Sequence, residues 1–362
     1  MKISHLTTVH TRYDTRIFKK QCISLSNIHE VSLIVADGKG NERVDDINII
    51  DAGKKNSKVK RALLSTTQVF KIAKNMNQDV YHIHDPELMW VGYILKLIYN
   101  KKVIFDSHED VPRDIKEKKW INKYLRSIIG FIYVFIEKIF LKKYSAIITS
   151  TDYILERMLK INIYSFSIKN YPIIDNNREI HIEKFNNEIV FCYIGSISEQ
   201  RGIFEMLELA LRINCKLHLA GTFTDSKTMR RAKQHDGWNN VIYHGYVDKI
   251  QMESIYSESS CGLLLLHEIE TFMTSLPVKI FEYMDFGLPI LSCGRHDYNN
   301  IIKKTHCGVV SSTSIDDIVN KAEIMINDKG DLMKMSINGI KNVSNYSWLS
   351  EESKLINIYR GL

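Results

Sequence analysis

The sequence lacks the features that mark small secreted or metal-stapled proteins. Its six cysteines form no Cys-x-x-Cys pair, which leaves a zinc knuckle or a thioredoxin-like redox motif without support. It contains no low-complexity tract and no short internal repeat. Hydrophobic residues make up 44% and charged residues 25% of the 362 positions, which is ordinary for a globular protein. These values exclude a disordered chain, a collagen-like chain and a small disulfide scaffold.

The cysteines and the N-terminus both indicate an intracellular protein. Cys192, Cys261 and Cys293 lie in or beside apolar runs, so we expect small buried hydrophobic residues in a reducing compartment and not catalytic thiols. The segment 1–5 leads into a short mixed run, without the long apolar stretch and small-residue cleavage site of a signal peptide. We therefore expect a cytoplasmic protein.

Positive charge is concentrated in the first half of the chain. Residues 1–175 hold 29 of the 49 Lys and Arg residues and 19 of the 42 Asp and Glu residues. The first half thus carries +10 and the remainder −3 of the net +7. Such asymmetry suggests that one half faces an anionic surface, either nucleic acid or membrane.

Short apolar runs rich in Ile and Val alternate with helix-length segments along the whole chain. Runs of this length without strict alternation suit strands buried on both faces of a parallel sheet. The predicted strands are 3–9, 31–36, 47–50, 80–84, 103–106, 146–150, 189–195, 217–220, 241–243, 262–266, 289–292 and 308–310. The segments 204–212 and 250–257 have helical spacing. This alternation predicts doubly wound α/β domains.

The alternating pattern occurs twice. It is interrupted near 171–187, where Pro172 and a run of Asn, Asp and Glu occur. We predict two Rossmann-like domains, 1–172 and 173–345, that face a cleft. The tail 346–362 is predicted to form a last helix, at 348–359, that packs back on the first domain.

One segment of the first half departs from this pattern. Residues 116–143 include eight basic and two acidic residues around the apolar stretch 128–136, which is too short and too charged to span a bilayer. It is either a buried helix with solvated ends or a helix lying on a membrane surface, with Trp120, Tyr124 and Phe131 near the headgroups. A second basic cluster, at Lys54, Lys55, Lys58, Lys60 and Arg61, belongs to the same half.

Polar residues follow the predicted strands, where ligands bind in open parallel sheets. In the first half the candidates are His10, Arg12, Asp14, Arg16, His84, Asp85, Glu87, Asp106, His108, Glu109 and Asp110. In the second half they are Gly195, Ser196, Ser198, Glu199, Arg201, Gly202, His267, Glu268 and Glu270. Such convergence of polar groups is typical of an active site.

The second half holds two candidate nucleotide-binding elements. The segment 195–202 (GSISEQRG) follows a strand and opens a helix, so its backbone N–H groups and Arg201 are suited to a phosphate. An ordinary strand–helix turn remains the alternative. Lys279 and Glu282, three residues apart, share a helix face and suit a diphosphate and a ribose, or form a plain surface ion pair.

These residues carry a resemblance. The segment 276–289 (LPVKIFEYMDFGLP) resembles the donor-binding region of retaining glycosyltransferases of family 4, which have the GT-B fold. The segment 195–202 is similar to the phosphate-contacting turn of that family, and 241–266 to its base-binding stretch. In the first half, the motifs at 10–17, 84–85 and 106–109 look like acceptor-side motifs of the bacterial surface-polysaccharide branch, which makes O-antigen and capsule.

The resemblance implies roles for particular residues. Arg201 and Lys279 would hold the donor diphosphate with the turn at Gly195, Ser196 and Gly202, and Glu282 would bind ribose. His108 would position the reacting sugar or its phosphate. The acceptor side would include His10, Asp14, Arg16, His84, Asp85 and Glu109, with Asp14 or Asp85 orienting the acceptor or assisting its hydroxyl proton.

The chain departs from the family pattern at two places. Many members carry a second glutamate eight positions before the ribose-binding one, where this chain has Thr274. Thr274 would bond the sugar directly, or Glu268 or Glu270 would approach the same place. The Gly-Gly turn common after the first strand is replaced by residues 10–13 (HTRY).

The implied reaction transfers a sugar from a nucleotide diphosphate sugar to a hydroxyl, with retention. No metal or other cofactor is expected, since two cations face the leaving diphosphate and no Asp-x-Asp motif occurs. The implied acceptor is an undecaprenyl-diphosphate-linked glycan, reached from the inner face of the cell membrane, where the basic first domain would bind peripherally.

Three other functions compete with this interpretation. A sugar-nucleotide epimerase or hydrolase of the same fold needs no acceptor. A nucleic-acid-binding regulator would use the basic half, but no helix-turn-helix, zinc finger or aromatic RNA-binding signature is present, and we expect no nucleic-acid partner. A dehydrogenase is disfavoured because Gly38-Lys39-Gly40 is followed by Arg43 in place of a third glycine.

Overall fold

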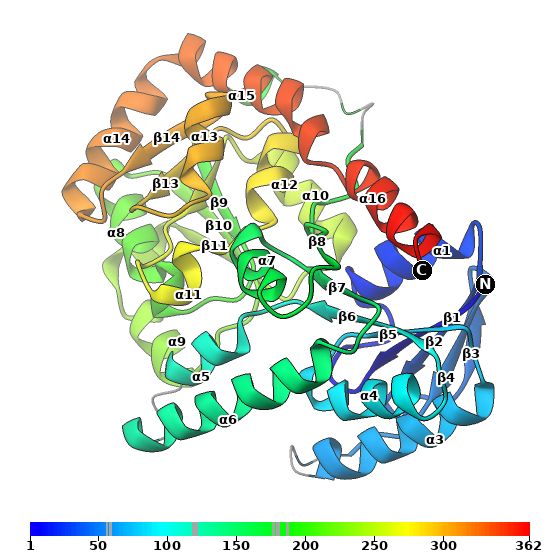
Figure 1. The fold of residues 1–362 in the computed structure, drawn as a ribbon. Helices are drawn as coiled ribbons and strands as arrows, with labels where there is room; N and C mark the ends of the chain where they lie inside the picture. Colours follow the sequence, from blue (N-terminus) through cyan, green and yellow to red (C-terminus); the bar gives the residue numbers. More distant parts are fainter. Residues whose placement is uncertain (56, 58–59, 118–121, 176–177, 179–181, 186–187) are drawn as a thin grey trace. The chain divides into compact units, whose positions relative to one another are not determined.

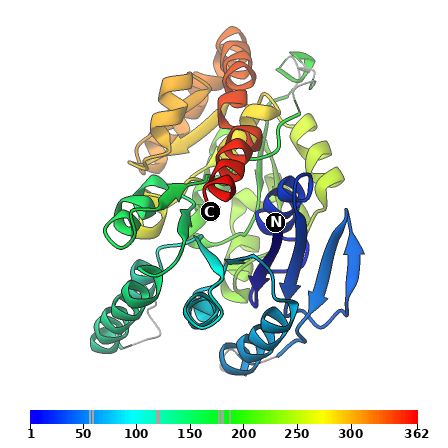
Figure 2. The ribbon, with the colours of Figure 1, turned by 45° about the vertical axis from the view of Figure 1, so that its right-hand side comes forward.

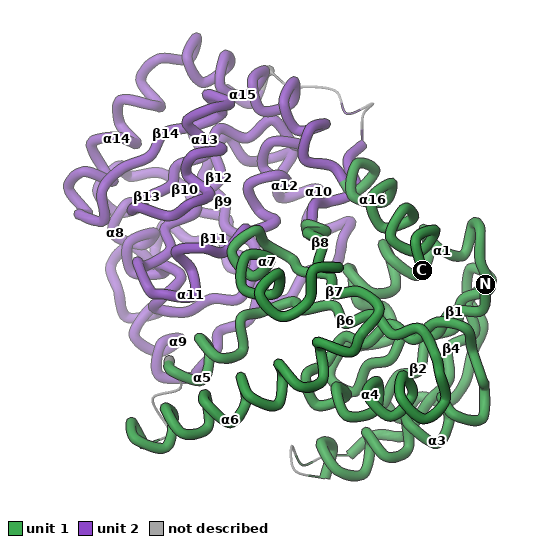
Figure 3. The backbone as a smooth tube through the Cα atoms, in the orientation of Figure 1, with its two compact units in different colours: residues 1–170, 348–362 green, residues 171–347 purple. Residues whose placement is uncertain are grey.

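The structure is a computed structural model that describes residues 1–362 except 56, 58–59, 118–121, 176–177, 179–181 and 186–187. The chain divides into two compact units (Figure 3). Unit 1 comprises residues 1–170 and 348–362, and unit 2 comprises residues 171–347. The sequence placed these divisions at 172 and 345.

Unit 1 is built on one sheet whose described strands, apart from the edge strand β3, run parallel. Its strands, in sheet order, are β3 (Glu42–Val44), β4 (Ile47–Asp51), β2 (Glu30–Val35), β1 (Lys2–Thr7), β5 (Val80–Ile83), β6 (Lys102–Ser107), β7 (Ala146–Thr149) and β8 (Ser165–Ser167). The chain leaves β1 toward β2 on one side and continues through β5 on the other. The order therefore reverses between β1 and β5, which is where a doubly wound sheet binds its ligands.

Helices cover both faces of this sheet (Figure 1). They are η1 (Ile17–Cys22), α1 (Ile23–Ser26), η2 (Arg61–Ser65), α3 (Thr66–Met76), η3 (Pro86–Leu88), α4 (Met89–Leu97), α5 (Val111–Glu117), α6 (Lys123–Leu141), α7 (Asp152–Leu159) and α16 (Trp348–Arg360). One apolar core joins the strands to η1, α1 and α16, and a second core joins them to α3, α4 and α7.

The last helix belongs to unit 1 although the chain reaches it from unit 2. Figure 2 shows α16, in red, beside the first helices, in blue. The Trp348 indole N–H donates to Ser24 Oγ at 2.9 Å, and Leu355 and Tyr359 are buried in the core with Leu25. Apolar burial and one indole hydrogen bond therefore fix this helix to the sheet.

Unit 2 has a six-stranded sheet, and all of its described strand pairs are parallel. Its strands, in sheet order, are β11 (Val241–Gly245), β10 (Lys216–Ala220), β9 (Val190–Ile194), β12 (Cys261–Leu264), β13 (Ile290–Cys293) and β14 (Gly308–Ser311). Here the order reverses between β9 and β12, which marks the corresponding ligand-binding edge.

Helices also cover both faces of the unit 2 sheet. They are η4 (Ile182–Phe185), η5 (Glu199–Arg201), α8 (Ile203–Ile213), α9 (Ser226–Lys233), η6 (Asp236–Asn240), α10 (Lys249–Glu258), α11 (Glu270–Met273), α12 (Lys279–Asp285), α13 (Asn299–Thr305), α14 (Ile315–Asn327), α15 (Lys329–Val343) and η7 (Ser344–Tyr346). One core packs α8 and α14 on the sheet, and the other packs α10, α12 and α13 on the opposite face.

The predicted fold class is confirmed, and all twelve predicted strands are present. The sequence missed β3 and β8, whose residues (ERV and SFS) form no apolar run because both lie at sheet edges. All six cysteines are buried without disulfides, as expected of small hydrophobic residues.

Candidate active site

A lysine lies directly over a glycine at the ligand-binding edge of unit 2. Gly195 follows β9, and Lys279 begins α12. A Cβ atom built on Gly195 would lie 2.5 Å from Nζ of Lys279 and 2.8 Å from its Cε. A side chain at position 195 would therefore displace the ammonium group, so glycine is required for this close approach.

A second cation, Arg201, accompanies Lys279. The Arg201 guanidinium carbon lies 5.3 Å from the Phe272 ring centre, and Lys279 Nζ lies 5.3 Å from the Tyr193 ring centre. Burial lowers the pKa of Lys279, and the charge of Arg201 lowers it further against the attraction of Glu282. No described carboxylate lies within 4.0 Å of either cation. Two partly buried cations with no carboxylate partner among the described residues are suited to bind an anion.

A carboxylate with a fixed orientation lies on the same helix. Glu282 is three residues after Lys279 on α12. The phenol of Tyr256, a fully buried residue of α10, donates to Glu282 Oε2 at 3.0 Å. The sequence did not single out Tyr256, since a tyrosine on an amphipathic helix is usually a residue of the hydrophobic core.

The remaining predicted donor residues lie on the loops around this site. Gly202 separates η5 from α8 in a left-handed conformation (φ 80°), and a Cβ there would lie 2.1 Å from the Leu265 carbonyl oxygen, so only glycine fits. Ser196 is exposed, and its carbonyl accepts from the Tyr193 hydroxyl at 2.9 Å. Thr274 ends α11 at its C-cap.

Of the two acids considered for the sugar, Glu268 is engaged by Arg295. Glu268 Oε1 accepts the backbone N–H of Arg295 at 2.8 Å, and the Arg295 guanidinium lies 3.4 Å from the carboxylate. Glu270 begins α11. Glu268 therefore serves the loop at Arg295 in this structure.

In unit 1, the loop after β1 is held by two carboxylates. Asp85 Oδ2 accepts from the Thr7 hydroxyl at 2.9 Å and from the backbone N–H of Val9 at 3.1 Å. Asp14 Oδ1 accepts the backbone N–H groups of Arg16 and Ile17 at the start of η1. Both predicted acids thus stabilise the loop.

His10 lies between these two carboxylates. Its Nδ1 is 3.2 Å from Asp14 Oδ2, and its Nε2 is 3.5 Å from Asp85 Oδ1. Burial lowers the pKa of His10, but Asp14 and Asp85 outweigh burial and raise it above the usual value. The His10 ring also lies against His108, with 4.9 Å between ring centres.

Asp106, which is fully buried, is the centre of the polar network of unit 1. Arg16 donates to both of its oxygens through Nε and Nη2, at 2.9 and 2.8 Å, and the Gln21 amide donates at 2.7 Å. His108 Nε2 lies 3.3 Å from Asp106 Oδ2 and 3.3 Å from His84 Nδ1. Although burial raises the pKa of Asp106, Arg16 and His108 hold it well below its usual range. The carboxylate therefore stays ionised.

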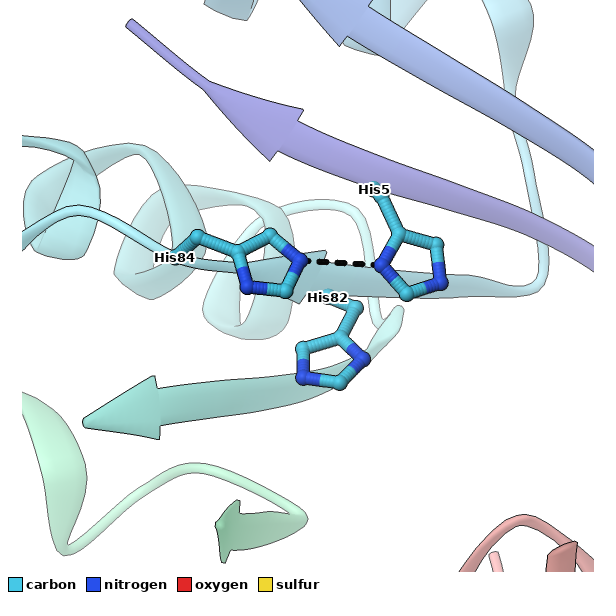
Figure 4. A group of neighbouring side chains, drawn as sticks. All are labelled: His5, His82 and His84. Atoms are coloured by element: carbon cyan, nitrogen blue, oxygen red, sulfur yellow. Dashed lines mark hydrogen bonds between the residues drawn. The ribbon is translucent and has the colours of Figure 1, made fainter. Parts of the chain in front are cut away.

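Three buried histidines extend this network: His5 on β1, His82 on the adjacent strand β5, and His84 directly after β5 (Figure 4). His5 Nδ1 lies 2.9 Å from His84 Nε2, and His82 Nδ1 lies 2.8 Å from the Tyr359 hydroxyl of α16. Burial lowers the pKa of all three histidines, that of His84 to about 3, so they are neutral at pH 7.

Two groups of ligand atoms in this network lie close enough to share a metal ion. Within His5, His82 and His84, and within His84, Asp106 and His108, the ligand atoms lie within 4.8 Å of one another. In the first group, a hydrogen bond joins His5 and His84. In the second, Asp106 is bonded to Arg16 and Gln21. Internal hydrogen bonds therefore already engage part of each group, although Nε2 of His5 and Nε2 of His82 have no hydrogen-bond partner among the described residues.

The sequence named His84, His108 and Arg16 but missed their common partners, His5, His82 and Gln21. The signal for the histidines was available, because His82 and His84 are two residues apart in the predicted strand 80–84 and would share a face. His5 pairs with His82 in the register of β1 and β5. Glu109 is exposed beside this network.

Two family models match the chain, each over one of the units. “Glycosyltransferase Family 4” matches residues 25–166, and “Glycosyl transferases group 1” matches residues 175–342. The chain belongs to the glycosyltransferases of the GT-B type. A search of curated protein sequences finds no match.

Solved glycosyltransferase structures share this fold over the whole chain. HepE from Anabaena, in complex with UDP-glucose, has a TM-score of 0.76 and 13% identity over 100% of both chains. Sucrose-phosphate synthase from Thermosynechococcus elongatus has a TM-score of 0.75 and 15% identity, over 99% of this chain and 98% of that one. WaaG, a glycosyltransferase involved in lipopolysaccharide biosynthesis, has a TM-score of 0.71 and 13% identity over 99% of both chains.

Proposed function

We propose that this glycosyltransferase transfers a sugar from a nucleotide diphosphate sugar to a hydroxyl of a lipid-linked oligosaccharide in the assembly of a bacterial surface polysaccharide. The acceptor would be an undecaprenyl-diphosphate-linked glycan of O-antigen or capsule synthesis. The reaction would proceed with retention and without a metal. HepE, which resembles this chain in fold, was solved with UDP-glucose.

The observation that carries this proposal is the cation pair of unit 2. When a glycosidic bond to a nucleotide diphosphate breaks, negative charge develops on the departing diphosphate. Arg201 and Lys279 lack a carboxylate partner within 4.0 Å among the described residues, so their charge is available for that leaving group. Preorganised cations of this kind stabilise the transition state. Glu282 would bind the ribose hydroxyls.

The residues of unit 1 would shape the acceptor side. His108 is the member of the Asp106 network that reaches the surface, with its side chain 17% exposed. It would position the reacting sugar or its phosphate. Asp14, Asp85 and His10 would fix the loop that meets the acceptor.

The membrane part of the proposal is supported by the surface of α6. None of the described helices is long and apolar enough to cross a membrane. Of the residues of α6, only Glu137 and Leu141 are buried, which contradicts the interpretation of this segment as a buried helix. Its exposed apolar side chains are Tyr124, Leu125, Ile128, Ile129, Phe131, Ile132, Val134, Phe135, Ile136 and Ile139. Trp120 lies outside the described residues.

Basic residues flank these apolar side chains. Lys123 and Arg126 lie at the start of α6, and Lys138, Lys142 and Lys143 lie at its end. Each basic residue near an anionic membrane contributes roughly 1 kcal/mol, which favours reversible binding of α6 in the headgroup region. Glu137 pairs with Arg157, which also lies 3.2 Å from Asp110 and so ties the helix to unit 1.

The sugar transfer is tested by incubating the protein with nucleotide sugars, with and without lipid-linked acceptors. We expect a new glycan product only when acceptor is present, with the anomeric configuration of the donor retained. Full release of free sugar or of an epimer without acceptor would contradict the transferase proposal.

Membrane binding is tested by sedimentation with anionic vesicles. We expect binding that weakens as salt increases, and weaker binding of a Phe131→Ser, Phe135→Ser double variant. Leu349→Ser is the matched control, since Leu349 is an exposed apolar residue of α16, 67% exposed. Binding that is insensitive to salt and to the α6 substitutions would contradict this part of the proposal.

A further inference from the structure

Glu282 and Lys279 are oppositely charged neighbours that do not form an ion pair in the structure. They are three residues apart on α12, a spacing at which opposite charges on a helix meet. No nitrogen–oxygen distance between them is within 4.0 Å, although both residues are described and their charges interact. The Glu282 carboxylate instead forms a hydrogen bond to a different residue.

That residue is Tyr256, whose phenol donates a hydrogen bond to Glu282 Oε2 at 3.0 Å. Tyr256 is fully buried, and its ring meets Tyr283 of α12 and Phe286, which directly follows α12, with ring centres 5.6 and 5.0 Å away. Such ring contacts restrict the hydroxyl to one direction. Its helix, α10, begins with a capping box between Asp248 and Gln251, which fixes the first turn.

This hydrogen bond gives the two oxygens of the Glu282 carboxylate different roles. Oε2 accepts from the Tyr256 hydroxyl, and no described residue donates to Oε1, which can therefore accept from a ligand. A carboxylate oxygen that accepts from a fixed donor is held in one rotamer, so its second oxygen meets a ligand hydroxyl without an ordering cost. If the contact were lost, Glu282 could turn toward Lys279, and the ammonium group would be neutralised for a bound anion.

We propose that Tyr256 is a positioning residue that directs the Glu282 carboxylate to the ribose hydroxyls of the donor and keeps it off the Lys279 ammonium. This inference rests on the proposed function, in which Glu282 binds ribose and Lys279 binds the diphosphate. The Tyr256 phenol thereby keeps the ribose-binding group, Glu282, apart from the diphosphate-binding group, Lys279.

The test measures how well the protein distinguishes UDP from 2′,3′-dideoxy-UDP by titration calorimetry, with the guanosine pair used if GDP binds more tightly. Tyr256→Phe removes one oxygen and keeps the ring. We expect it to lower the UDP to dideoxy-UDP affinity ratio by about tenfold, as the loss of one well-oriented charged hydrogen bond predicts. The dideoxy compound itself should bind a few-fold more weakly, since Glu282 would then compete for Lys279.

The matched control is Tyr283→Phe. Tyr283 is equally buried on α12, but its hydroxyl donates to the Leu263 carbonyl at 3.1 Å. This variant should lose similar thermal stability and keep the wild-type affinity ratio. An equal fall of the ratio in both variants would overturn the proposal, because general loosening of the core would then explain it.

Two further variants separate the inference from the proposed function. Glu282→Gln should abolish the discrimination, and if it leaves the ratio unchanged, the assignment of Glu282 to ribose fails. If Glu282→Gln lowers the ratio but Tyr256→Phe does not, the positioning role of Tyr256 fails. Should Tyr256→Phe not fold, Glu282→Asp withdraws the carboxylate from the phenol by one methylene and should lower the ratio to the same extent.

Discussion

Arg16 in unit 1 and Arg201 in unit 2 both lie near the carboxyl end of a central sheet strand, but their surroundings differ. Arg16 is buried and bonded through two nitrogens to Asp106. Arg201 has no described carboxylate within 4.0 Å and lies beside another cation, Lys279. A buried charge that is paired inside the protein holds neighbouring side chains in place, whereas a buried charge without a partner is available to a bound ligand of opposite charge. The polar network of unit 1 therefore balances its own charges around His108, whereas the cations of unit 2 are suited to an anionic ligand.

The largest expected difference between the units is their response to acid. His5, His82 and His84 have pKa values below those of unfolded histidine, because burial opposes their charged forms. Below about pH 6.5 the unfolded chain takes up protons that folded unit 1 does not bind, so stability falls as the pH falls. Three such groups cost up to about 4 kcal/mol per pH unit. The raised pKa of His10 adds no slope here, since its contribution is already complete below pH 6.5.

Hydrogen exchange between pH 7 and pH 5.5 measures this difference, because amides of β1 and β5 report on unit 1 and those of β9 and β12 on unit 2. We expect protection corrected for intrinsic rates to fall much more in β1 and β5. An equal fall in both sheets would contradict the account of the buried histidines.

The second prediction removes one cation from each unit. Arg16→Met leaves the Asp106 carboxylate buried without its main partner and should lower the free energy of unfolding of unit 1 by about 3–5 kcal/mol. Lys279→Met removes a partly buried cation without a counter-ion and should leave stability unchanged or raise it by up to about 1 kcal/mol. Urea unfolding checks both values, and a larger loss in Lys279→Met than in Arg16→Met would reverse the comparison.

The smallest predicted effect concerns two glycines. Gly195→Ala places a methyl group where the Lys279 ammonium lies and should weaken binding of UDP, or of the preferred nucleoside diphosphate, by about tenfold, or about 1.4 kcal/mol. Gly130→Ala on α6, where a Cβ meets no atom within 4 Å, should leave binding unchanged and stabilise the helix by about 0.5–1 kcal/mol. Titration calorimetry measures both, and equal binding by the two variants would remove the assigned position of Lys279.

The sequence predicts the interior of both sheets because buried parallel strands are continuous apolar runs. The edge strands β3 and β8 escape prediction, since their short polar segments are recognised only through their neighbours. For the helix at 116–143 the sequence left burial and exposure open. Composition alone does not decide this, because apolar residues on all sides of a helix are compatible with either a core or a surface position.

The sequence predicts the charged residues of the candidate site but does not predict which residues they contact. Arg201, Lys279 and Glu282 follow from local spacing and resemblance. Tyr256 and Gln21, in contrast, reach Glu282 and Asp106 from distant segments, 26 and 85 residues away along the chain. Asp14 and Asp85 look like free acids in the sequence, but backbone N–H groups bind them in the structure. Such pairings depend on tertiary contacts that spacing does not encode.

The most direct test of the central claim is the thermal shift that nucleoside diphosphates and their sugars produce in the wild type and in Arg201→Ala and Lys279→Ala. A ligand that binds only the folded protein raises its melting temperature. If the two uncompensated cations hold the diphosphate, the preferred nucleotide should stabilise the wild type and neither variant, while both variants melt near the wild-type temperature without ligand. A full shift that survives in both variants would contradict the account.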